Sequence, residues 1–175
     1  ASSRYTYWLP TDEIGVLGLS LGKFTNTSAD TSAVAVFEGE SELSSQYYAI
    51  YPYPDQNFQS AGDGKLIFNI PAVQKYQKNT FATDVVPMVT KFKSGDELYF
   101  KNACGGLVIK VKGVEKIKSM RLVAYEQSGV EARIAGECLV DMNAEEYVIT
   151  PEASASTSVS IDCGEGVQLN DSEPT

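Results

Sequence analysis

The chain has 175 residues, of which 43% are hydrophobic and 21% are charged, as in an ordinary globular protein. Its formal net charge is -9 and it contains no histidine, which disfavours nucleic-acid binding and excludes Ser-His-Asp triads and His-based metal sites. No apolar run approaches the roughly 20 residues of a membrane-spanning helix. The composition therefore predicts a folded domain that lacks histidine-dependent catalytic sites.

The first half of the chain predicts strands separated by loops. Gly15, Gly18 and Gly22 argue against a helix in the first apolar stretch. Thr, Asn, Ser and Asp residues dominate positions 23–32 and predict a loop. β-branched and aromatic residues, stopped by Gly or Pro, then predict strands at residues 34–38, 47–51 and 65–70.

The second half contains the clearest strand pattern. Residues 71–95 are spaced too unevenly for one helix and contain Pro87, so they predict a long crossing segment with one helical turn. After Gly105 and Gly106, residues 107, 109 and 111 are apolar and alternate with Val108 and two lysines. Further strands are predicted at residues 97–102, 116–125, 133–140, 147–150 and 158–163. Together these elements predict an all-β, antiparallel β-sandwich with long loops and little helix.

The expected domain organisation is one complete sandwich followed by a connection. Residues 1–163 contain all the predicted strands and form the expected N-terminal domain. Residues 164–175 are mostly polar and contain two glycines and a proline. They are interpreted as a linker towards a second domain that is absent from this chain.

The three cysteines, Cys104, Cys138 and Cys163, lie far apart without the spacing of a metal or redox motif. Each has strand-like neighbours, in which a free thiol behaves as a small hydrophobic group. Two interpretations stay open: three buried free thiols, or one disulfide and one free thiol.

An ordered series of short motifs runs along nearly the whole chain. It comprises residues 12–16 (DEIGV), 37–39 (FEG), 49–53 (AIYPY), 70–74 (IPAVQ), 87–89 (PMV), 98–108 (LYFKNACGGLV), Gly113, the strand at 117–122 and residues 134–136 (IAG). This series resembles the fimbrillin-like surface lipoproteins of Gram-negative gut and oral bacteria. The resemblance implies a transthyretin-like β-sandwich, usually followed by a second sandwich.

The resemblance also implies a function, partners and a location. Members of this family are pilus stalk, tip or anchor subunits, or surface proteins of unknown binding role at the outer membrane, held there by a lipid anchor that this chain does not carry. In polymerising members, cleavage after an arginine frees a groove that accepts a strand from the next subunit. Arg4 is the only arginine before Arg121, but it is not favoured as that cleavage site. The expected partners are other subunits, further copies of the chain, or a host protein or glycan.

Aromatic residues give the main candidate contact site: Trp8, Tyr47, Tyr48, Tyr51 and Tyr53. Their rings could form the half-buried face of a sandwich strand, stack on the apolar face of a sugar, or contact a protein. The sequence therefore favours a non-enzymatic structural or adhesive surface protein, a fimbrial subunit or related lipoprotein. The alternative is a glycan-binding surface module of a polysaccharide uptake system.

Acidic residues give weaker candidates. Asp55, Asn57 and Asp63 could offer oxygen ligands to calcium, but their spacing matches no calcium loop, so turn formation is preferred. The adjacent pairs 12–13, 96–97 and 145–146 could supply the two carboxylates of a glycosidase. Neighbours on a strand point to opposite faces, however, so no enzyme, cofactor or metal is expected.

Overall fold

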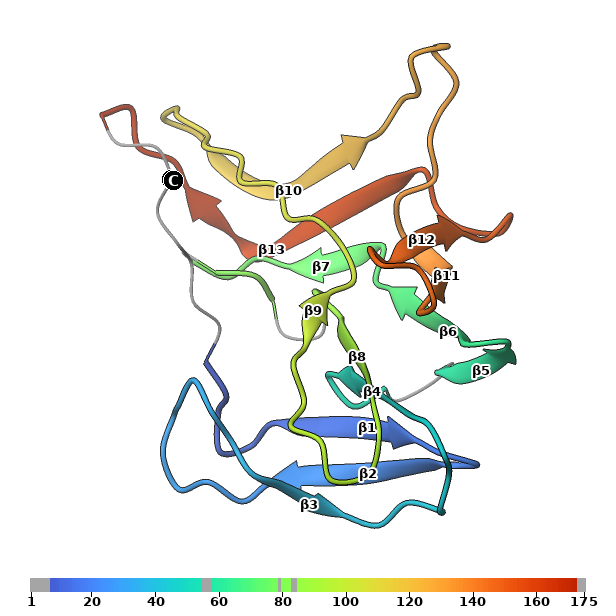
Figure 1. The fold of residues 1–175 in the computed structure, drawn as a ribbon. Helices are drawn as coiled ribbons and strands as arrows, with labels where there is room; N and C mark the ends of the chain where they lie inside the picture. The colour runs from blue at the N-terminus through green and yellow to red at the C-terminus, as the bar shows by residue number, and fades with distance from the viewer. Residues whose placement is uncertain (1–6, 55–57, 79, 83–84, 173–175) are drawn as a thin grey trace.

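A computed structural model describes residues 7–54, 58–78, 80–82 and 85–172. These residues form thirteen strands and no helix, which confirms the predicted all-β class (Figure 1). The strands make three sheets, and nearly all neighbouring strands are antiparallel.

The largest sheet has six strands in the order β3-β2-β1-β4-β8-β9 and forms the lower part of Figure 1. Its strands are β1 (Glu13–Leu17), β2 (Leu21–Asn26), β3 (Phe37–Gly39), β4 (Tyr47–Tyr51), β8 (Met88–Phe92) and β9 (Lys101–Asn102). The central strand β4 matches the predicted strand at residues 47–51. Both edge strands, β3 and β9, are very short, which is a common protection against edge-to-edge aggregation.

The second sheet has four strands in the order β12-β11-β6-β5. Its strands are β5 (Gln59–Gly62), β6 (Lys65–Ile70), β11 (Gly136–Asp141) and β12 (Val148–Pro151). Leu66, Phe68 and Ile70 alternate with more exposed residues along β6, so one face of this strand is buried. They pack in one core cluster with Leu17 and Val89 of the six-stranded sheet, which gives the two sheets a sandwich-like arrangement.

The third sheet has three strands and is less buried than the other two. It contains β7 (Val73–Lys75), β10 (Lys116–Val123) and β13 (Ser158–Gln168), with β13 in the centre and parallel to β7. None of the described residues in these three strands is buried. β13 pairs with β10 as far as Gln168, so the structure places residues 164–168 of the predicted linker in this sheet.

Three predicted segments differ from the structure. Residues 23–26 belong to β2 rather than to a loop, because pairing with β1 outweighs the turn-forming composition. The crossing segment at 71–95 contains β7 and β8 and no helical turn in its described part. Residues 107–112 are not assigned to any strand, although their alternation predicts one.

Within the described residues, no helix is long and apolar enough to cross a lipid bilayer.

Candidate binding groove

The six-stranded sheet is apolar on both faces. Leu17 and Ile50 face the core shared with the four-stranded sheet, whereas Ile14, Val16 and Ala49 belong to a second buried cluster on the other face. Consecutive residues of a strand point to opposite faces, so β1 and β4 are hydrophobic without alternation. The second face therefore also needs a cover that shields it from water.

Two irregular segments cover this second face, which we call the outer face. Residues 33–41 lead into and out of β3, and residues 94–100 connect β8 to β9. Between them lies a groove of about 1140 Å³. Its floor is formed by side chains of five strands and its walls by the two segments. The lining includes Ile14, Val16, Phe24, Phe37, Tyr47, Phe92, Leu98 and Phe100.

Trp8 is fixed at one wall of the groove. Its backbone N–H donates to Ser32 O at 2.8 Å, and Ser32 N–H donates back to Trp8 O at 3.1 Å. The following turn is held by the buried carboxylate of Asp12, which accepts hydrogen bonds from Leu9 N–H at 2.7 Å and the Tyr51 hydroxyl at 3.0 Å. These bonds fix the backbone on both sides of Trp8.

The aromatic rings around Trp8 meet it edge-on. The indole lies 5.1 Å from Phe37, 5.1 Å from Tyr51 and 5.4 Å from Phe100, with interplanar angles of 80°, 89° and 68°. T-shaped contacts of this kind are typical of packed aromatic clusters. The groove wall is therefore a set of interlocked rings rather than a flat stacking platform.

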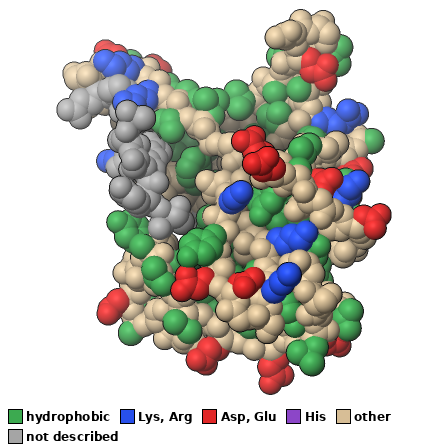
Figure 2. Space-filling view, in the orientation of Figure 1, with side chains coloured by type: hydrophobic (Ala, Val, Ile, Leu, Met, Phe, Trp, Pro, Cys, Tyr) green, Lys and Arg blue, Asp and Glu red, His purple; other side chains and the backbone are tan. Residues whose placement is uncertain are grey.

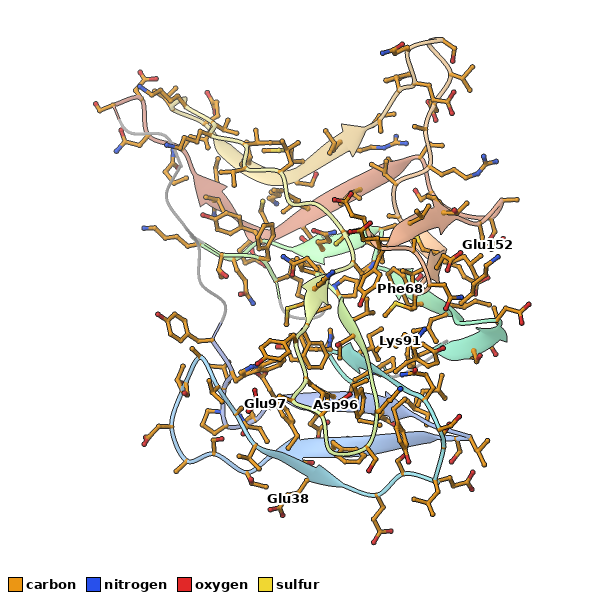
Figure 3. The ribbon with its side chains drawn as sticks, in the orientation of Figure 1. Glu38, Phe68, Lys91, Asp96, Glu97 and Glu152 are labelled. Carbon is orange, nitrogen blue, oxygen red and sulfur yellow. The ribbon has the colours of Figure 1, made fainter. Side chains whose placement is uncertain are left out.

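The charged residues that line the groove are acidic. Glu40 and Glu97 are both exposed, and no Lys or Arg side chain is among the lining residues in the described part of the chain. The hydroxyl of Tyr99 donates to Glu97 Oε2 at 2.7 Å, and this hydrogen bond, with the adjacent negative charge, raises the pKa of Tyr99. Figure 3 shows Asp96 and Glu97 on the β8–β9 connection and Glu38 on β3. Figure 2 shows apolar and acidic side chains side by side over this part of the molecule.

The structure brings together only part of the predicted aromatic site. Trp8 and Tyr47 line the groove, and Tyr51 supports Trp8 from the side. Tyr48 lies on the opposite face, where it packs against the shared core and burial raises its pKa. Tyr53 lies beside the Lys23 ammonium, 5.1 Å from the centre of its ring.

Several groove residues were not predicted from the sequence. Phe24 lies in a segment that was interpreted as a loop, and Leu98 and Phe100 lie in a predicted strand of which only the end pairs. Phe92 stacks on Tyr47 at 5.4 Å, but it belongs to β8, a strand that the sequence did not reveal. The aromatic residues between positions 92 and 100 were the one sequence feature that could have indicated this part of the groove.

No family model, curated protein or solved structure matches this chain. What the groove binds must therefore follow from its shape and charge. The interlocked, half-buried rings over the buried floor and the two exposed acidic side chains suit an extended, apolar and positively charged partner.

Among the described residues, no group of three or more Cys, Asp or Glu side chains is placed to hold a metal ion. Asp63 has a φ of 50° in the turn between β5 and β6, which agrees with its predicted role in a turn, whereas Asp55 and Asn57 lie outside the described residues, as does Arg4. Of the carboxylate pairs, Asp12 is used in the turn beside Trp8, Glu13 pairs with Lys23 at 2.7 Å, and Asp96 accepts a hydrogen bond from Lys93 N–H at 2.8 Å.

All three cysteines are free thiols. Cys138 is buried on β11, and Cys104 packs against the same core from the end of β9, whereas Cys163 is half-buried on β13. Desolvation by burial raises the pKa of all three. For Cys138, burial together with the nearby Cys104, Glu152 and Glu137 raises the pKa from the ordinary thiol value of 9.0 to about 11.

We expect Cys138 to make the folded state sensitive to alkali. Because its pKa is higher in the folded chain than in the unfolded chain, the folded state holds this proton more tightly. Its contribution is complete below pH 9 and is lost as the pH rises from 9 to about 11. Urea unfolding at pH 8, 9, 10 and 11 should show a smaller loss of unfolding free energy for Cys138→Ala than for the wild type. Parallel pH profiles for the two proteins would contradict this expectation.

Proposed function

We propose that the chain is a non-enzymatic structural or adhesive protein of the bacterial cell surface, either a fimbrial subunit or a related surface lipoprotein. In this proposal it has a transthyretin-like sandwich and joins other subunits, or copies of itself, by strand addition at the outer membrane or in a fimbrium. The order of its sequence motifs supports the fimbrillin-like assignment. The lipid anchor and the second domain belong to the same proposal.

The observation that carries this proposal is the groove on the outer face of the six-stranded sheet. It is lined mostly by apolar side chains, and it lies beside β3, an edge strand of three residues with unpaired backbone groups along one side. A strand added there would gain main-chain hydrogen bonds and would place alternate side chains against half-buried groove residues such as Phe24 and Phe37. A catalytic site would need converging polar groups, whereas most of the side chains that line this groove are apolar.

A glycan-binding role is the alternative, and one observation bears on it. A sugar platform needs exposed and roughly coplanar rings, but the rings that contact Trp8 meet it at 68° to 89°, and the stacked ring of Tyr47 is buried. The ring of Tyr99, 74% exposed, is the one groove ring available for stacking in the part of the chain that the structure describes. One exposed ring and two carboxylates are weaker evidence for sugar binding than the apolar groove side chains are for the binding of a strand.

Light scattering of the purified protein over a range of concentrations tests the proposal. A subunit that assembles by strand addition should show a weight-average mass that increases with concentration, and a ladder of species after mild proteolytic trimming. A mass that stays at that of one chain, before and after trimming, contradicts the assembly role. Saturable binding of a soluble oligosaccharide by the same monomer would favour the glycan-binding alternative.

A further inference from the structure

The connection between β9 and β10 has the pattern of a strand but no strand partner. Leu107, Val108 and Ile109 are 63%, 54% and 44% exposed. Among the described residues, no backbone hydrogen bond joins residues 105–112 to a neighbouring segment. Exposed apolar side chains on an extended segment with free backbone groups are a typical starting point for association with another chain.

This segment, residues 107–112, also carries positive charge. In an extended conformation, Leu107, Ile109 and Val111 would lie on one face, and Lys110 and Lys112 on the other. With a net charge of -9, two copies of the chain repel each other at long range. The segment is a local exception to that charge, and the groove offers it Glu40 and Glu97 without a competing lysine or arginine in its described lining.

The groove has room for a peptide segment, since it measures about 1140 Å³. An extended segment of six residues is about 20 Å long and offers three side chains to one face. The chain's own segment leaves β9 in the direction of the three-stranded sheet (Figure 1).

We propose that the groove of one copy of the chain binds residues 107–112 of a second copy. Leu107, Ile109 and Val111 of the second copy contact the half-buried apolar side chains of the groove, and its Lys110 and Lys112 lie near Glu40 and Glu97. The backbone of the segment pairs with the free side of β3. This inference rests on the proposed assembly function, for which it names the partner and the contact.

Reversing the charges on each side of this contact tests the inference. One variant carries Glu40→Lys and Glu97→Lys, and the other carries Lys110→Glu and Lys112→Glu. All four side chains are exposed, so both variants should fold, as circular dichroism would verify. Each variant alone should self-associate at least about tenfold more weakly than the wild type, because like charges then face each other across the contact.

An equal mixture of the two variants gives the decisive result. In the mixture, the groove of each variant is complementary in charge to the segment of the other, so sedimentation velocity should show association between the two variants, restored towards the wild-type level. If the wild type associates and each variant alone associates equally well, this contact is wrong and the proposed function stands. If the wild type remains a monomer at all concentrations, both the contact and the assembly role are overturned.

A peptide provides an independent measurement on the wild-type chain. Trp8 is the only tryptophan and lines the groove, so its fluorescence should change saturably when the peptide GGLVIKVKG is added. The peptide GGLVIEVEG, with both lysines replaced, should bind at least about tenfold more weakly. A third peptide with the same composition but scrambled order controls for attraction to an acidic protein. Equal binding of all three peptides would overturn the inference.

Discussion

Replacing Phe68 with alanine should strongly destabilise the folded protein. The ring is 1% exposed, lies on β6 directly opposite Cys138 of β11, and belongs to the core cluster shared by the two large sheets (Figure 3). Truncating a buried phenylalanine costs about 3–5 kcal/mol, through lost burial and the cavity left behind. Because domains of this kind are stable by only about 5–15 kcal/mol, the loss should be visible in urea or thermal unfolding.

The matched control is Leu43→Ala. This side chain is 86% exposed, so its truncation should change the free energy of unfolding by less than about 0.5 kcal/mol. A similar unfolding midpoint for Phe68→Ala and Leu43→Ala would show that the two sheets do not share a core around Phe68.

The second large effect is expected at Gly22, where an added Cβ has no room. Gly22 lies on β2 opposite Val16, and a Cβ built there would come 2.1 Å from the backbone oxygen of Glu40. That oxygen belongs to the segment that closes one end of the groove, so the segment must move away. Gly22→Ala should therefore cost about 1–3 kcal/mol, the usual range for overpacking, and should alter the fluorescence of Trp8.

Gly105→Ala separates this steric effect from a general effect of glycine replacement. A Cβ at Gly105 meets no atom within 4 Å, so the change should be close to neutral for both stability and fluorescence. Equal stability of the Gly22 and Gly105 variants would mean that residues 40–41 do not lie against β2.

The sequence predicted those strands whose local pattern agrees with their surroundings. Residues 47–51 and 65–70 correspond to β4 and β6 because β-branched and aromatic residues end at a proline or a glycine. β2 escaped prediction because its stability comes from pairing with β1 on one side and β3 on the other, and the polar residues Lys23, Thr25 and Asn26 give no local sign of that pairing. For β8, Pro87 was interpreted as an interruption, although it directly precedes the strand.

The groove was less accessible to sequence analysis because it depends on distant residues. Trp8 and Tyr47 were singled out for their aromatic character, but nothing local indicates that residues 33–41 and 94–100 border the same surface. Tyr48 and Tyr53 were grouped with them only by closeness in sequence, and the alternation of β4 sends Tyr48 to the other face. Side-chain composition predicted an aromatic site, whereas sheet order determined which rings belong to it.

The order of the strands also has a consequence for how the chain can be synthesised and folded. The six-stranded sheet is complete once β9 exists, but the face that contains Leu17 and Val89 is covered only when β11 has joined β6. A growing chain that ends before β11 would therefore leave part of this core open to water. We expect slow folding, because the pairings that complete the core join segments that are far apart in the sequence.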